Sequence, residues 1–93
     1  MHEIGYRRVL DRVTSVRPPA QPDEEAEFEV WCALVEAEAE FAGLLATAAS
    51  HGRVDASQWE RVRRSLERID APEGSLAEWR EALRGAVAEV CPG

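Results

Sequence analysis

The chain has 93 residues, of which 45% are hydrophobic and 31% are charged, and its formal net charge is −7. This length allows a single domain with one core, and the composition excludes collagen-like and intrinsically disordered classes. The acidic balance disfavours nonspecific binding to nucleic acids and to anionic membranes, because both require excess positive charge on the protein.

No stretch of the sequence approaches the roughly 20 apolar residues that a membrane-spanning helix needs, and the first residues lack the basic and then apolar layout of a secretory signal. We therefore expect a cytoplasmic protein with no membrane association. Cys32 and Cys91 are too few for a disulfide framework and lack zinc-ligand spacing, so both are interpreted as thiols. All eleven basic residues are arginine, a bias typical of GC-rich bacterial genomes.

The first predicted element is a helix over residues 3–16. Its apolar residues recur at the three- and four-residue spacing of one helical face. They are Tyr6, Val9, Leu10, Val13 and Val16. Residues 18–22 contain three prolines and are expected to form a stiff, extended linker, because each proline removes a backbone donor and restricts the residue before it.

The second predicted helix, over residues 23–50, is the longest element. Asp23 is expected to act as its N-cap, and the glutamates that follow put negative charge at the positive end of the helix dipole. Nothing interrupts the helical pattern until residues 50–52, where Gly52 is expected to take the left-handed conformation that ends a helix. With a rise of about 1.5 Å per residue, this helix spans roughly 40 Å.

The third predicted helix covers residues 57–70. It has an apolar face with helical spacing. This face consists of Trp59, Val62, Leu66 and Ile69. Pro72 follows closely and blocks continuation of the helix.

The fourth predicted helix covers residues 76–90. It is expected to begin with a capping box, in which Ser75 and Glu78 satisfy each other's backbone donors. The apolar faces of three different helices each carry a tryptophan, and we expect these side chains to share one core. They are Trp31, Trp59 and Trp79.

These four amphipathic segments predict an all-α fold, a small four-helix bundle that forms one domain over residues 1–93. The bundle is built on one long central helix, at about 23–50, with three shorter helices around it. The helix at 57–70 is expected to cover the C-terminal half of the long helix, and the helix at 3–16 its N-terminal half. If this cover is incomplete, apolar surface is left for a partner at Phe28, Trp31 and Val35.

An acidic ladder is predicted along one edge of the long helix. Eight of the 18 acidic residues lie between residues 23 and 51, a stretch without arginine. Four of them project within about 60° of one another, although like charges four residues apart mildly destabilise a helix. The ladder is either a solvated face or a surface that docks against a basic partner. Its members are Glu25, Glu29, Glu36 and Glu40.

Glu38 departs from this pattern, because it projects into the apolar side of the long helix. A buried carboxylate without a partner would shift its pKa or destabilise the fold. We therefore expect an ion pair between Glu38 and an arginine from a neighbouring helix. A functional carboxylate is the alternative.

A basic stripe is predicted on the third helix, on the face opposite its apolar residues. Its guanidinium groups have the geometry to bind phosphates or carboxylates. The alternative is a solvated face whose positive charge is offset by Glu60 and Glu67. If the stripe and the acidic ladder both remain exposed, they can also pair between two copies of the chain. The stripe consists of Arg61, Arg64 and Arg68.

The sequence contains no phosphate-binding loop, nucleophile elbow or di-iron motif. We therefore predict a noncatalytic interaction module, without cofactors, that self-associates as a homodimer or docks on a protein partner through its long acidic helix. The alternative is a small acidic inhibitor, such as an immunity or anti-defence protein, that occludes a basic nucleic-acid-handling site. A nucleic-acid binder that uses the basic stripe is less consistent with the net charge.

Overall fold

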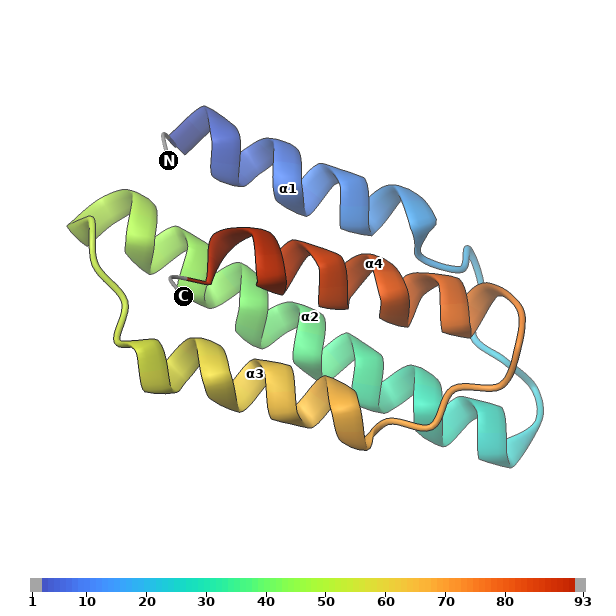
Figure 1. The fold of residues 1–93 in the computed structure, drawn as a ribbon. Coiled ribbons are helices and arrows are strands. Elements are labelled where there is room, and N and C mark those ends of the chain that lie inside the picture. The colour runs from blue at the N-terminus through green and yellow to red at the C-terminus, as the bar shows by residue number, and fades with distance from the viewer. Residues whose placement is uncertain (1–2, 92–93) are drawn as a thin grey trace.

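The computed structural model describes residues 3–91, with side chains from residue 5 onward, so the two ends of the predicted 1–93 domain lie outside the described residues. Its helices are α1 (Glu3–Val16), α2 (Glu25–His51), α3 (Ala56–Arg68) and α4 (Ser75–Val90). Consecutive helices run in opposite directions (Figure 1). The predicted all-α, four-helix bundle is confirmed. Within residues 3–91, no helix combines the length and apolarity that crossing a membrane requires.

The centre of the bundle is shared by two helices. Both α2 and α4 pack against all three other helices, whereas α1 and α3 lie on opposite sides and do not pack against each other within the described part of the chain. The molecule is correspondingly flat, with principal extents of 40 × 23 × 17 Å. The long helix is therefore central, as predicted, but α4 is equally so, because the two parallel helices approach across the diagonal of the bundle.

The core consists of the side chains that all four helices turn toward this diagonal. Trp79 and Phe41 are its largest fully buried members. Phe41 also meets Trp59 edge-on, with ring centroids 6.1 Å apart and an interplanar angle of 65°. Trp59 and Trp79 are thus core residues, as predicted. Trp31 also packs against this core, as predicted, but it lies at the margin and is only half-buried.

The position of α1 along α2 differs from the prediction. Tyr6 and Leu10 line a groove together with Ala42 and Ala49, so α1 covers the C-terminal half of α2 rather than the N-terminal half. The physical reason is the extended linker, in which each residue spans up to about 3.3–3.6 Å. Arg17, just before the linker, lies at Glu38 in the middle of α2, so the linker spans the distance back to the start of that helix.

The starts of α2 and α4 also differ from prediction. Glu24, not Asp23, is the N-cap of α2, and its side chain makes no capping hydrogen bond. At α4 the N-cap is Gly74, with φ 123°, so Ser75 already lies inside the helix and the predicted capping box with Glu78 does not form. A serine caps a helix only from a non-helical backbone position, and the glycine occupies that position here.

A capping box does form at α3. The Asp55 carboxylate accepts a hydrogen bond from the backbone N–H of Ser57 at 3.1 Å, and the Asp55 N–H donates to Oε1 of Gln58 at 3.2 Å. The preceding Gly52 takes the predicted left-handed conformation, with φ 69°, at the end of α2. The helix α3 ends at Arg68, two residues before the predicted end, because Ile69 is extended and packs its side chain against the core.

This difference between the two caps leads to a prediction. Replacing Asp55 by alanine should lower the free energy of unfolding by about 1 kcal/mol, because the backbone donors at the start of α3 lose their acceptor. Ser75→Ala is the matched control and should change stability by only a few tenths of a kcal/mol, since that side chain caps nothing. Urea unfolding followed by circular dichroism measures both. Equal losses in the two variants would contradict the assignment of the caps.

Candidate functional site

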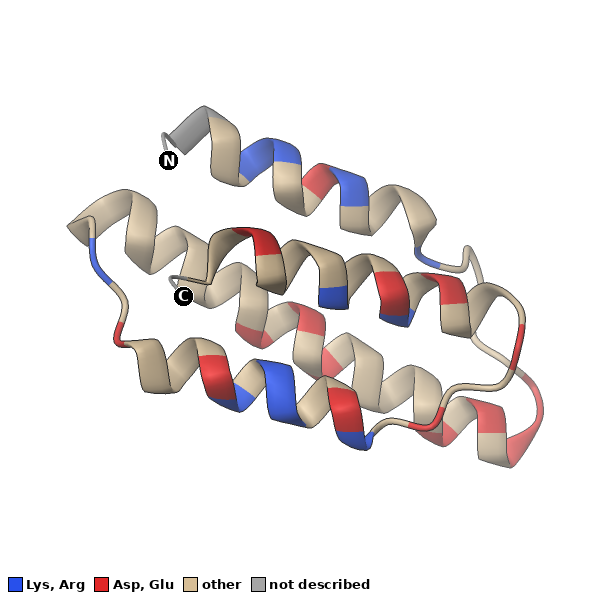
Figure 2. Cartoon of the chain, viewed as in Figure 1, with Lys and Arg blue, Asp and Glu red and all other residues tan. Residues whose placement is uncertain are grey.

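The acidic ladder lies on the outer edge of α2, but its members differ in their surroundings. Glu25, Glu29 and Glu36 are exposed and form no ion pair with any residue in the described range 3–91. Glu40 is half-buried and accepts a hydrogen bond from Nε of Arg61 at 2.9 Å. Figure 2 shows further acidic residues gathered at the end of the bundle where α2 begins. The structure thus leaves three of the four ladder carboxylates available to a partner.

Phe28 lies beside this acidic row. It is 38% exposed and is the one large hydrophobic side chain classed as exposed among residues 5–91. Its ring stacks on that of Trp31, with centroids 5.9 Å apart and an interplanar angle of 16°. Trp31 and Val35 are half-buried and pack against the core. The apolar surface predicted at these three residues is therefore centred on the exposed ring of Phe28, which stacks on the indole of Trp31.

The helical register explains why the ring and the carboxylates are adjacent. At about 100° per residue, Phe28 falls between the side of α2 that meets the core and the edge that carries Glu25 and Glu29. The backbone N–H of Phe28 donates to the Glu24 carbonyl at 2.8 Å, so the ring is carried by the first regular turn of the helix. The position of this aromatic side chain is consequently set by helix geometry and not by a loop.

The basic stripe on α3 is largely neutralised by the chain itself. Arg61 is paired with Glu40, and Nε of Arg64 lies 3.5 Å from Oε1 of Glu60. Within the described residues, Arg68 alone of the three has no ion pair. The acidic ladder and the basic stripe therefore meet inside one molecule, at the Glu40–Arg61 pair. The predicted contact between the ladder of one copy and the stripe of another would have to replace the ion pairs that Arg61 and Arg64 form within each molecule.

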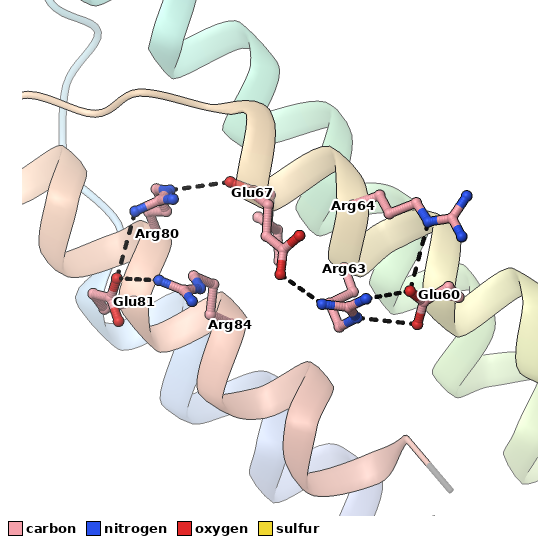
Figure 3. Close-up of polar contacts among 8 residues, drawn as sticks. Glu60, Arg63, Arg64, Glu67, Arg80, Glu81 and Arg84 are labelled. Carbon is pink, nitrogen blue, oxygen red and sulfur yellow. Dashed lines mark hydrogen bonds and ion pairs between the residues drawn. The ribbon is translucent and has the colours of Figure 1, made fainter. Parts of the chain in front are cut away.

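Other arginines of α3 and α4 also bind carboxylates or carbonyls of this chain (Figure 3). Arg63 contacts both Glu60 and Glu67, and its hydrogen bond lowers the pKa of Glu60. Arg80 donates to the Leu66 carbonyl at 3.0 Å and so links the two helices. Positive charge on this side of the bundle is thus engaged locally, which contrasts with the unpaired carboxylates of α2.

Glu38 is buried in the interior, 6% exposed, as its position on the apolar side of α2 predicts. Nη1 of Arg17 lies 3.8 Å from its Oε2, which confirms the predicted ion pair with an arginine. The same guanidinium lies over the Trp79 ring, 5.4 Å from the centroid. Burial raises the pKa of the Glu38 carboxyl, whereas the positive charge of Arg17 and the indole N–H of Trp79 oppose that rise. Neither Oε2 of Glu38 nor Nε1 of Trp79 makes a hydrogen bond of ordinary geometry, so the indole acts only as a weak polar contact.

The partners in two ion pairs could not be identified from the sequence. Arg17 follows the last residue of α1 and is 21 positions from Glu38, and the same separation divides Glu40 from Arg61. Local spacing reveals which side of a helix a residue occupies, but not which distant residue meets it. The one available signal was that Arg17 stands directly before the proline-rich linker, where the chain changes direction.

Within residues 3–91, no three His, Cys, Asp or Glu side chains are arranged to hold a metal ion. Cys32 and Cys91 do not form a disulfide with each other. Comparison of the chain with protein-family models, with curated proteins and with solved structures gives no match.

Proposed function

We propose that this chain is a noncatalytic, cytoplasmic protein-interaction module that docks on a basic protein partner through the N-terminal half of α2. The observation that carries the proposal is the exposed Phe28 ring, stacked on Trp31 and bordered by carboxylates that have no ion pair within residues 3–91. We define the binding surface as Glu25, Phe28, Glu29 and Glu36.

This combination has the composition of a protein-binding site. Aromatic side chains that enter a pocket on the partner contribute much of the affinity of an interface. Complementary charge around such an anchor raises the association rate and excludes wrong partners. Phe28 supplies the anchor, and the surrounding glutamates select a partner that presents arginine or lysine around an apolar pocket.

Two observations favour a different protein as the partner over a second copy of this chain. The net charge of −7 makes two copies repel each other. The guanidinium groups that would meet the acidic ladder of a second copy are already engaged, Arg61 by Glu40 and Arg64 by Glu60. Sedimentation velocity over a range of concentrations and salt should therefore show a monomer. A dimer that Glu29→Arg dissociates would instead assign this surface to self-association.

Photo-crosslinking in the source cells identifies the partner. A benzophenone amino acid at position 28 should capture one protein that the same group at the exposed Ala88, on α4, does not capture. The purified partner should then bind the chain directly. If positions 28 and 88 give the same adducts, or the isolated candidate does not bind, the proposal is wrong.

Charge reversal then tests the acidic row quantitatively. Glu29→Arg should weaken binding to the purified partner by about tenfold or more, mainly through a slower association rate that becomes less sensitive to salt. Asp11→Arg makes the same change of charge on the exposed face of α1 and should leave the affinity within about twofold. Surface plasmon resonance at two salt concentrations measures both. Equal effects of the two variants would show that only net charge matters.

A narrower form of the proposal is that the partner handles nucleic acid and that the acidic row occludes its basic site. The concentration of eight acidic residues between residues 23 and 51 supports it. In that case DNA or RNA should compete with the chain for the purified partner. Direct binding of nucleic acid by the chain is not expected, because Arg61 and Arg64 are engaged by carboxylates. A titration at low salt tests this expectation.

A further inference from the structure

Glu38 is the one charged side chain classed as buried among residues 5–91. Its carboxylate has few polar contacts for a buried group. Oε2 accepts no hydrogen bond, and the nearest positive charge, Nη1 of Arg17, is 3.8 Å away. Buried polar groups are nearly always hydrogen-bonded, and an exception calls for a physical explanation. This carboxylate is separate from the proposed binding surface, since it faces the interior of the bundle and not the outer edge of α2.

Arg17 connects this carboxylate to the proline-rich linker. Its backbone N–H closes the last turn of α1 by donating to the Thr14 carbonyl at 3.2 Å, and Pro18 follows directly. Pro18 and Pro22 line a shallow groove together with Leu76 at the start of α4. The linker thus lies against the bundle, and the Arg17 side chain, directly before the linker, contacts Glu38 of α2 and Trp79 of α4.

We propose that Arg17 and Glu38 form an acid-sensitive latch, in which the ionised carboxylate holds Arg17 over Trp79 and fixes the start of the linker. When Glu38 takes up a proton from solvent, the ion pair is lost and the linker loosens. Loss of the pair leaves the Arg17 guanidinium beside solvent. Its side chain is 39% exposed, so it can be hydrated after release without being buried unpaired.

The latch involves a single titrating group. From the segment after α1, Arg17 faces the carboxylate, and from α4 the indole N–H of Trp79 does. Among the ion pairs of residues 5–91, the one with Arg17 is the only one that Glu38 forms. Burial is the largest influence on the carboxyl and raises its pKa, so the change occurs at a less acidic pH than for an ordinary glutamate.

Two probes follow the two halves of the latch. In protein labelled with 5-fluorotryptophan, the ¹⁹F resonance of Trp79 reports the state of the adjacent pair. The hydrogen-exchange protection factor of the Arg17 amide, which donates to the Thr14 carbonyl at 3.2 Å directly before the linker, reports whether the start of the linker is held and is called linker protection below. Between pH 8 and pH 4, Trp79 should show one transition with its midpoint above the usual glutamate range, and linker protection should fall several-fold over the same interval.

The variants separate the latch from general effects of pH. Glu38→Gln should abolish the Trp79 transition and leave the linker weakly protected at every pH. Glu36→Gln, a matched change at an exposed position of the same helix, should preserve both responses. Arg17→Gln should also loosen the linker at every pH, while the Trp79 transition persists with a higher midpoint because the cation that opposes protonation is gone.

Two results would overturn the latch. One is a Trp79 transition that survives Glu38→Gln, since another group would then be titrating. The other is linker protection that remains constant with pH and is unchanged in Arg17→Gln. Arg17 is exposed enough that its variant is expected to fold, so the second result is decisive independently of the Glu38→Gln variant.

Discussion

Replacing Trp79 by alanine should lower the free energy of unfolding by about 3–5 kcal/mol. Trp79 is fully buried, and it belongs to α4, which packs against all three other helices. Its removal deletes apolar contacts to several elements at once and leaves a cavity that a four-helix bundle closes only in part. Because native domains are stable by only about 5–15 kcal/mol, this single substitution should remove a large share of the total stability.

Urea unfolding followed by circular dichroism measures this loss. Phe28→Ala is the control, since this ring is 38% exposed and its truncation should cost about 1 kcal/mol or less. Trp79→Phe should lie between the two, because it retains part of the buried volume. If Trp79→Ala were no more destabilising than Phe28→Ala, the diagonal contact of α2 and α4 would not be the centre of the core.

Glu38→Gln should raise the stability at neutral pH, because it removes a buried carboxylate whose ionised form the folded protein disfavours. Burial raises the pKa of Glu38 in the folded protein above its ordinary value of 4.5, against the opposing effect of Arg17. The folded state therefore binds this proton more tightly than the unfolded state. Stability contributed by this group falls as the pH rises from about 4.5 to the folded pKa, and glutamine removes that loss.

The pH dependence makes this prediction specific. At pH 7.5 the variant should be more stable than the parent, and near pH 4 the difference should shrink toward zero, because the parent carboxyl is then protonated in both states. Glu36→Gln, at an exposed position of the same helix, is the matched control. A difference that grows as the pH falls would mean that the ion pair with Arg17 outweighs the cost of burial.

The sequence by itself determined those features that depend on short-range order. The spacing of apolar residues located the four helices, and the absence of proline between Asp23 and Gly52 indicated that one helix is long. The same projection placed Glu38 on the apolar side and the acidic ladder on the outer edge. The helix caps were less predictable. The capping box expected at Ser75 does not form, because Gly74 occupies the N-cap position of α4. A capping box forms at Asp55, at the start of α3.

Only the tertiary structure decided how the helices meet. The path of the linker places α1 over the C-terminal half of α2, and the diagonal approach of α4 gives Trp79 its central position. The packing of these elements brings Arg17 next to Glu38 and Arg61 next to Glu40. Such pairs depend on the path of a linker and on the angles at which helices pack, and the periodicity within each helix carries no information about either.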